Sequence, residues 1–342
     1  MKSYFRIAMA VSCVLALVGG AATAQDDLSA QLNKVGAQNV QNYIAPIFNG
    51  FAADLNSGFY HSADLHDVLG FDLGVKVGLA LITDAEKTYD FVTPDNIKIK
   101  NPLGGTFTLT SGIDYDKVIS GVPTVVGAAD QNSVHMKSTS AYYAAYRAAN
   151  NSSDVLFPIP PGFNLPAVPL PMPQLNLGLP FGLEFMLRYV PTIPAGDYGK
   201  VNLSGFGLRY DIGQWIPLCP VDIAVHIMTQ KMAFKSKDDK DIFSGKGTAY
   251  GLEVSKKLLI LTLYGGFQLE NASFTLAKTD GAFKTPDGTE TTFTIPEMTF
   301  DGQNKSRFTL GVRLQLFIIN IHAEYSFAKT PVAALGAGIS IR

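Results

Sequence analysis

Two groups of polar side chains have the residue types of a hydrolase site. His322, Glu324 and Ser326 alternate along one segment. Asp222 and His226 share one face of another. A catalytic dyad needs its two side chains within hydrogen-bond reach, whereas residues four apart in a strand stand roughly 13 Å apart at the usual rise. Neither group can act as a dyad along its own strand, and we expect no enzymatic activity.

Metal or cofactor chemistry has equally little support. His61 and His66 lie close to Asp64 and Asp67, but without a helical register that would bring the four together. We interpret them as solvated loop residues. The chain lacks the G-x-S-x-G, H-E-x-x-H, P-loop and C-x-x-C motifs, and Cys219 is the only cysteine after residue 24. We therefore predict no catalytic, cofactor-binding or metal-binding residues.

The first 24 residues have the pattern of a secretory signal peptide. Lys2 and Arg6 flank the start of the apolar run Ile7–Val18, and a small-residue cleavage site ends at Ala24. The apolar run is too short for a membrane helix, which needs about 20 residues. The 27 basic and 29 acidic residues leave no basic excess for binding nucleic acid. We expect export, with cleavage after Ala24.

The rest of the chain alternates apolar and polar residues with a period of two. This pattern runs through segments 69–81, 181–189, 221–228, 259–270, 307–316 and 319–327. Alternate side chains of a strand point to opposite faces, so each segment has one apolar face and one polar, glycine-rich face. Such segments suit tilted membrane strands of about 9–11 residues better than soluble strands of about 5–6.

These features predict an all-β fold, a transmembrane antiparallel β-barrel of about ten strands, with eight to twelve as the range. A secreted all-β binding protein is the alternative, because a soluble sandwich shows the same period. Short turns fall at the end of the barrel that holds the C-terminus, and long or charged loops fall at the other end. The expected location is the outer membrane of a Gram-negative bacterium, with membrane lipid around the barrel. The sequence does not determine an oligomeric state.

Three parts follow the expected signal peptide at 1–24. Residues 25–67 form a helical, hatch-like segment that would plug or cap the barrel from its periplasmic end. Residues 68–342 form the barrel, with a long insertion at 84–175. Within the insertion, 104–111 is the candidate for the tenth strand. A short helix is expected within 138–150, and the proline tract 157–173 is expected outside the sheet because proline cannot donate to a ladder.

The inward faces predicted for the strands mix both signs of charge. A strongly ion-selective pore would carry rings of one sign, whereas this mixture favours ion pairs that brace a narrow lumen. The predicted lumen-facing residues are Asp72, Lys76, Glu184, Arg188, Arg209, Asp211, Asp222, His226, Glu253, Glu270, Arg307, Arg313, His322 and Glu324.

Several segments resemble a family of uncharacterised bacterial outer-membrane-like proteins, named only as a domain of unknown function. The resemblance is carried by Leu179–Val190 (LPFGLEFMLRYV), Gly205–Arg209, Gln214–Ile223, Ala249–Ser255 and Leu263–Gly266. It is good over roughly 175–275 and looser elsewhere. The resemblance implies a barrel and no catalytic residues.

A looser likeness concerns the segment ahead of the first strand. Residues 50–63 are similar to the hatch of fatty-acid-transport-type barrels, without its Asn-Pro-Ala signature; Asn56-Ser57-Gly58 stands nearby. The functional expectation is a passive channel or uptake protein for small molecules, including hydrophobic ones. The alternative is a structural or surface-interaction barrel without transport.

Overall fold

The structure is a computed structural model that describes residues 26–100, 106–194, 199–284 and 290–342. The predicted signal peptide lies outside the described residues. The chain divides into two compact units. The barrel unit comprises residues 47–82, 166–277 and 299–342. The insertion unit comprises the residues up to Pro46, 83–165 and 278–298.

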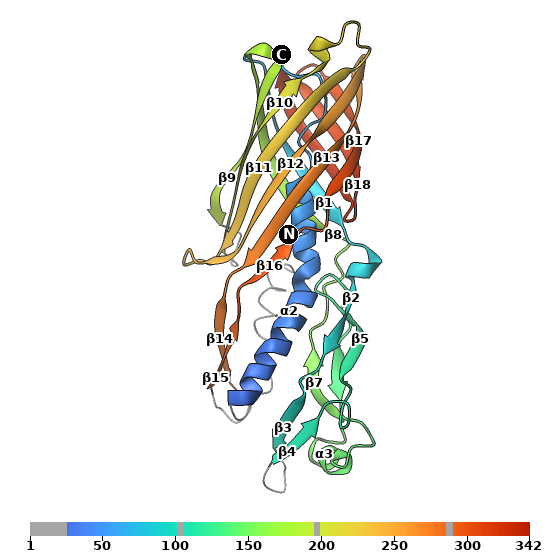
Figure 1. Ribbon diagram of the computed structural model, residues 1–342, viewed down its shortest axis with the longest axis vertical. Helices are drawn as coiled ribbons and strands as arrows, with labels where there is room; N and C mark the ends of the chain where they lie inside the picture. Colours follow the sequence, from blue (N-terminus) through green and yellow to red (C-terminus); the bar gives the residue numbers. More distant parts are fainter. Residues whose placement is uncertain (1–25, 101–105, 195–198, 285–289) are drawn as a thin grey trace. The chain divides into compact units, whose positions relative to one another are not determined.

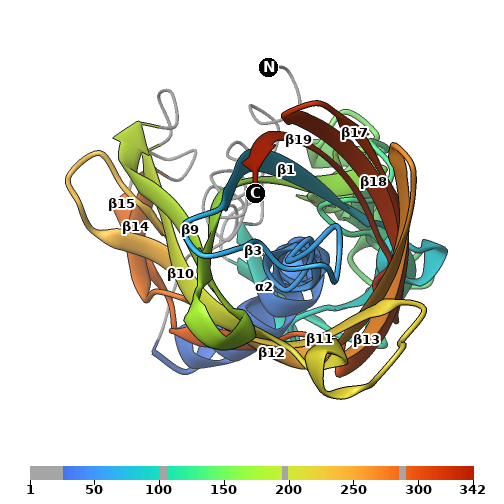
Figure 2. The same cartoon turned by 90° about the horizontal axis from the view of Figure 1, so that it is seen from above.

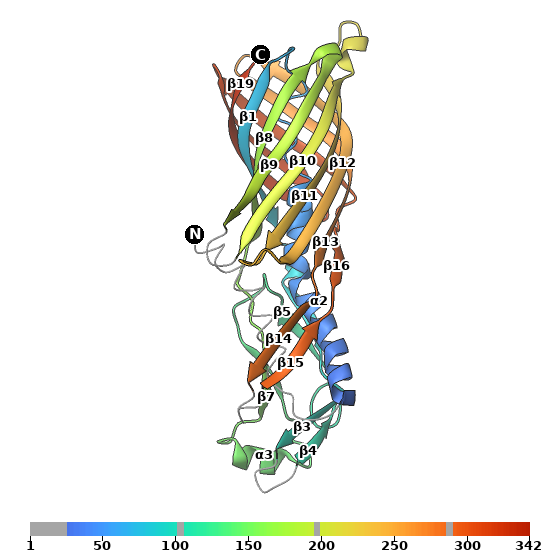
Figure 3. The ribbon, with the colours of Figure 1, turned by 90° about the vertical axis from the view of Figure 1, so that its left-hand side faces the viewer.

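The barrel unit is a closed antiparallel meander of ten long strands (Figures 1 and 3). Each strand pairs with the next along the chain, the last pairs with the first, and the short strand β16 (Met298–Asp301) adds to β13. The ten strands are β1 (Phe71–Leu81), β8 (Ala167–Leu179), β9 (Leu183–Pro194), β10 (Lys200–Asp211), β11 (Asp222–Lys235), β12 (Asp241–Leu258), β13 (Leu261–Leu276), β17 (Ser306–Leu316), β18 (Ile319–Phe327) and β19 (Val332–Ile341). This confirms the predicted fold class and strand number.

The barrel wall has the two faces that the alternation predicts. Large apolar side chains are exposed outward, among them Val75, Phe206, Leu310, Ile321 and Leu335. Their sequence neighbours point into the barrel and are buried or half-buried. None of the helices in the described part of the chain is both long and apolar enough to cross a membrane.

The tenth strand is not the predicted one. In the candidate segment 104–111, β4 (Thr106–Thr110) pairs with β3 (Asn96–Lys100) in a separate two-stranded sheet, and residues 104 and 105 lie outside the described residues. Five-residue strands are too short to span a bilayer. The missing barrel strand is β8, which takes up the last residues of the insertion expected at 84–175.

The placement of the proline tract outside the sheet is therefore wrong for its last part. Pro169, Pro171 and Pro173 lie within β8 and oppose residues of β1. A proline is tolerated where its nitrogen faces no paired strand. Pairing of β8 with its other neighbour, β9, begins only at Gln174, after the last of the three prolines.

The N-terminal segment forms one helix, α2 (Asp26–Leu55). Buried apolar side chains recur at helical spacing through Val40, Tyr43, Ile44, Ile47 and Phe48, as the sequence pattern predicts. The two units divide at Pro46, inside the helix. Beyond Leu55 the chain turns at Gly58, whose φ of +67° is a left-handed conformation that favours glycine.

The insertion unit is built from short hairpins around its own core. Its strands are β2 (Thr88–Val92) with β5 (Val118–Pro123), β3 with β4, β6 (Asn132–His135) with β7 (Val155–Ile159), and β14 (Thr279–Lys284) with β15 (Glu290–Ile295). Helix α3 (Tyr143–Ala149) lies where a short helix is predicted. The core contains Ile97, Leu109, Tyr115, Val122, Val134, Met136 and Ile159.

A charge placed on the outward face should be costly in proportion to its depth in lipid. Leu310→Arg, in the middle of β17, should lower the free energy of unfolding by about 2–4 kcal/mol, and Leu316→Arg, at the end of the same strand, by about 0–1 kcal/mol. Both leucines are about equally exposed, at 49% and 48%. The measurement is urea unfolding in lipid vesicles. Equal, small costs at both positions would contradict a lipid-facing wall.

Candidate functional site

The lumen of the barrel unit contains the end of α2 and the loop that follows it. We call residues 47–66 the plug. Every side chain from Ile47 to Ala63 is buried, and Figure 2 shows this part of the chain inside the ring of strands. Because ten strands enclose a narrow lumen, the plug meets the inward side chains of the wall from all directions.

The plug makes at least one direct contact with each of the ten strands. The wall partners are Lys76 (β1), Gln174 (β8), Arg188 (β9), Arg209 (β10), Gln230 (β11), Ser255 (β12), Gln268 (β13), Arg307 (β17), His322 (β18) and Ser340 (β19). In most of these contacts a wall side chain donates to a backbone carbonyl of the plug. A segment held in this way has a fixed path through the lumen.

Inward glycines make room for the plug. A Cβ at Gly78 would lie 2.5 Å from a carboxylate oxygen of Asp54, and a Cβ at Gly247 would lie 2.7 Å from the amide oxygen of Asn56. The glycine-rich character of the polar faces is therefore a requirement of close approach.

Arg188 holds the turn of the plug. Its guanidinium is completely buried and donates to the carbonyls of Ser57 at 2.6 Å and Gly58 at 2.8 Å. It also donates to Gln174 at 2.8 Å and lies over the ring of Phe59, 4.7 Å from its centre. A buried charge is tolerated when its hydrogen bonds are satisfied, and here carbonyl dipoles and an aromatic face do this.

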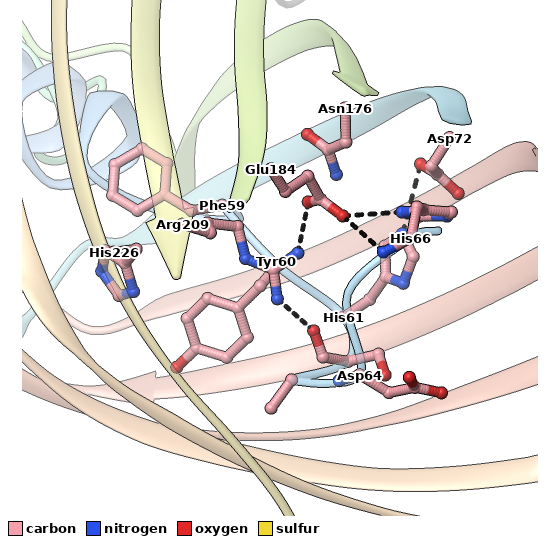
Figure 4. Close-up of polar contacts among 12 residues, drawn as sticks. Phe59, Tyr60, His61, Asp64, His66, Asp72, Asn176, Glu184, Arg209 and His226 are labelled. Atoms are coloured by element: carbon pink, nitrogen blue, oxygen red, sulfur yellow. Dashed lines mark hydrogen bonds and ion pairs between the residues drawn. The ribbon is translucent and has the colours of Figure 1, made fainter. Parts of the chain in front are cut away.

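Two further arginines combine a carboxylate with a plug carbonyl. Arg209 donates to Glu184 at 2.5 Å (Figure 4), to Glu253 at 2.7 Å and to the carbonyl of Ser62. In the same way, Arg307 pairs with a wall carboxylate, Glu270, at 2.7 Å and donates to the carbonyl of Ala53 at 2.6 Å. The sequence predicts ion pairs that brace the lumen, and these ion pairs are of that kind. The same arginines also connect the wall to the plug.

Two histidines of the plug complete the polar end of the lumen. His66 Nδ1 lies 2.7 Å from Glu184, and its Nε2 lies 2.9 Å from Ser340 Oγ. The ring of His61 stacks on that of His322 with centroids 4.5 Å apart. Burial lowers the pKa of His61 well below its usual value, and the ammonium group of Lys76 lowers it further. Both histidines are buried, which corrects their interpretation as solvated loop residues.

The other end of the lumen is apolar. Phe48 of the plug stacks on Phe300 at 4.5 Å and meets Phe243 edge to face at 5.4 Å. Phe51 packs against Phe243 and Phe274 at 5.9 and 6.1 Å. The plug is therefore embedded in an aromatic cluster where it enters the barrel and in a hydrogen-bonded network further along.

Most of the predicted lumen-facing residues are buried inside the barrel, and two differ. Asp211 and Asp222 are only half-buried at strand ends, where Asp211 accepts from the backbone of Gln214 and Asp222 from Ser255. The buried ones are Asp72, Lys76, Glu184, Arg188, Arg209, His226, Glu253, Glu270, Arg307, Arg313, His322 and Glu324.

The hydrolase-type groups are not assembled into a site. Ser326 Oγ pairs with Thr309 at 2.8 Å, and Glu324 accepts from Tyr264 at 3.0 Å. His322 Nδ1 lies 3.2 Å from Asn320. Among the described residues, no group of three or more His, Cys, Asp or Glu side chains could hold a metal ion.

The whole chain matches one protein family. Residues 1–341 match a family described as a family of unknown function, DUF6588. The chain belongs to this family. Comparison with curated proteins gives no match.

Solved structures similar to the chain are outer-membrane barrels of low identity. OmpT of Vibrio cholerae, an outer membrane protein in its trimer form, has 10% identity and a TM-score of 0.24, with 79% of this chain and 98% of that chain covered. The toluene transporter TodX of P. putida has 9% identity and a TM-score of 0.22, with 88% and 92% covered. Similarity at this level carries no functional information.

Sequence reasoning missed the uncharged half of the network. Gln174, Gln230 and Gln268 donate to plug carbonyls as the arginines do. Gln230 and Gln268 continue the alternation that placed the charges of β11 and β13, so the period of two could have found them. Gln174 lies on β8, the strand that the sequence did not predict. The plug atoms that these side chains contact belong to the backbone, which leaves no residue pattern to detect.

A pH test follows from Asp54, which is completely buried at the end of α2. Burial raises the pKa of Asp54 well above its usual value, an effect that the backbone of Ala80 and the charge of Arg307 only partly offset. Because the folded state binds the proton more tightly than the unfolded state, stability should fall as the pH rises from about 4. Asp54→Asn should remove this fall. At pH 7 it should stabilise the protein by more than about 1.4 kcal/mol, the equivalent of one pKa unit.

The measurement is urea unfolding of both proteins between pH 4 and pH 7. The two proteins should be equally stable near pH 4, where the protonated acid resembles the amide. Parallel pH profiles would show that Asp54 is not buried in the folded barrel.

Proposed function

We propose that this protein is an outer-membrane barrel, closed to ions by its plug, that takes up small apolar molecules. The observation that carries the proposal is the plug, which hydrogen-bonds or packs against every strand and is apolar at one end.

Three features support the outer membrane. The ladder closes on itself and has no free edge strand, which hydrocarbon would not tolerate, and only β8 and β9 pair over part of their length. The outward face is apolar. The sequence begins with a signal-peptide pattern. Short turns join the strands at the end that holds the C-terminus, while the chain leaves the barrel for residues 83–165 and 278–298 at the other end, as in bacterial outer-membrane barrels.

An open, water-filled pore does not fit this lumen. Arg188, Arg209 and Arg307 donate their hydrogen bonds to the plug and to other residues of the wall. A route for ions through the lumen would have to break these contacts, and each unsatisfied buried group costs about 1–3 kcal/mol.

The apolar end of the lumen points to the class of molecule. Aromatic side chains pack against the start of the plug: Phe243, Phe274 and Phe300 contact Phe48, and the first two also contact Phe51. A polar solute would lose its hydration there without finding hydrogen-bond partners. An apolar molecule meets no such cost.

The plug enters the barrel from the end opposite to the one expected for the hatch-like segment. Phe48 packs among the residues of β12, β13 and β16 at the barrel end from which the two long insertions leave, and His66 lies beside Glu184 and Ser340 at the other end. With the insertions facing outward, the chain threads into the lumen from the outer side. Entry from the periplasmic end, as the sequence suggested, does not fit this path.

A second candidate function is supported by the insertion unit. It has its own buried core, including Leu109, Tyr115 and Ile159, so it is more than a set of turns. Such a folded unit suits a surface-interaction barrel that binds a partner and transports nothing.

Conductance in planar bilayers tests the closed lumen. The wild-type protein should give no stepwise ion currents. Arg188→Ala should produce openings, because the carbonyls of Ser57 and Gly58 lose their donor. Lys257→Ala, an exposed residue at a strand end, is the control and should stay silent. Large steady currents from the wild type would contradict the proposal.

Dye uptake tests the permeant class. Gram-negative bacteria that express the protein should accumulate the apolar dye 1-N-phenylnaphthylamine faster than bacteria with an empty vector. Uptake of a charged dye should not change. If neither dye enters faster, the surface-interaction function is the better one.

A further inference from the structure

The wall of the barrel has one seam that its sequence prevents from closing. β8 and β9 are paired from Gln174–Arg188 to Leu179–Leu183, and β8 residues 167–173 pair with β1 alone. If the register continued to the β-bulge that β9 has between Val190 and Ile193, Pro173 would oppose Tyr189 and Pro171 would oppose Pro191. We call this unpaired stretch, residues 167–173 and 189–194, the proline seam.

The chemistry of these residues explains the gap. Successive backbone N–H groups of a strand point to opposite sides, so residues 169, 171 and 173 face the same neighbour. The ladder to β1 runs past all three prolines without a break, so their nitrogens face β9. These two pairs would exchange four hydrogen bonds, and three of them would need a proline N–H that does not exist.

The same substitution makes an open seam tolerable in lipid. An unsatisfied N–H in hydrocarbon costs several kcal/mol. On the β8 side of the seam, three of the four residues whose backbone nitrogens face β9 are prolines, so only Ala167 keeps such a donor, and on the β9 side Tyr189 keeps one. Elsewhere in the wall, an equal gap would expose a donor at every second residue of each strand.

Both sides of the seam are apolar. On the outer side, Tyr189 is 60% exposed, next to exposed Val75 of β1. On the luminal side, β8 carries Val168, Leu170 and Met172, all buried. The inward residues of β8 become polar at Gln174, where pairing with β9 begins.

The luminal strip of β8 also meets the plug. A Cβ on Gly50 would lie 2.6 Å from a methyl group of Val168, so the helix backbone packs directly against the strip. An apolar molecule that crosses the seam would therefore arrive between β8 and the apolar end of the plug.

We propose that the proline seam is a lateral passage through the barrel wall, by which small apolar molecules move between the lumen and the surrounding lipid. The nature of the permeant rests on the proposed function; the opening of the seam does not. Apolar molecules suit this route because they never leave an apolar surface along it.

Cysteine labelling tests the passage without any permeant. In a Cys219→Ser background reconstituted in lipid vesicles, Met172→Cys places a thiol behind the seam. Met186→Cys and Met228→Cys are matched controls, because both methionines are buried and inward-facing at paired positions of the wall. Pyrene maleimide dissolved in the lipid should label Met172→Cys at least about tenfold faster than either control, as when opening costs about 1.4 kcal/mol less.

Two labelling results would overturn the proposal. Equal rates in the three variants would show that the seam is closed. Equally fast labelling of Met172→Cys by a charged methanethiosulfonate reagent would show that the route is aqueous.

Restoring the missing donors should close the passage. With Pro169, Pro171 and Pro173 all replaced by Val, labelling of Met172→Cys should slow about tenfold. Leu175→Val with Leu177→Val, on the same face of β8 where β9 is paired, is the control and should leave the rate unchanged. An unchanged rate in the proline variant overturns the proposal.

If the proline variant does not fold, hydrogen exchange of the unmodified protein decides. The amide of Tyr189 should exchange about tenfold or more faster than those of Phe185 and Leu187, which lie in the paired part of β9. Equal protection overturns the proposal.

Dye uptake separates the seam from the function. Slower uptake of 1-N-phenylnaphthylamine in the proline variant supports the passage as the route. Uptake that stays fast while labelling slows overturns it as the route and leaves the proposed function intact. No uptake by the wild type defeats the proposed function, while labelling still tests the seam.

Discussion

The buried guanidinium groups of the lumen need hydrogen-bond acceptors, and the backbone carbonyls of the plug supply them. Arg188, Arg209 and Arg307 project from three different strands and converge on carbonyls between Ala53 and Ser62. Without the plug, these groups would need water; without the arginines, the carbonyls would be buried and unsatisfied. Wall and plug therefore depend on each other.

This dependence divides the lumen into two regions. Where the plug is still helical, its carbonyls are satisfied within the helix, and aromatic side chains such as Phe48 and Phe243 can surround it. Where the helix ends at Leu55, the backbone carbonyls have no donor within the helix, and arginine and glutamine side chains of the wall donate to them. The end of one helix thus fixes where the lumen changes from apolar to polar.

The proline seam lies beside the apolar region and not the polar one. Inward residues of β8 are apolar as far as Met172 and polar from Gln174, and its pairing with β9 begins at Gln174 as well. A single strand therefore carries a switch in both hydrogen bonding and polarity at one point. Under the proposed function, this part of the wall would admit apolar molecules, whereas the plug would exclude ions.

Much of the barrel could be predicted from the sequence, because the relevant signal is local. The alternation through segments such as 307–316 and 319–327 gave the faces of the strands, and with them most of the lumen-facing charges. The tenth strand could not be predicted in the same way. Prolines argue against a strand in general, and only the arrangement of neighbours shows that those of β8 face a side without a partner.

What the sequence determined by itself is the period of two, which sets one face of every strand toward lipid whatever its neighbours are. Only the tertiary structure decided which residues are in contact. Arg188 binds the turn at Gly58, and His61 stacks on His322. The physical reason is that these contacts join residues far apart in the chain, and many are made to backbone atoms that all residues share. The sequence gives the identity of each side chain. The path of the plug backbone is set by closure of the barrel wall around it.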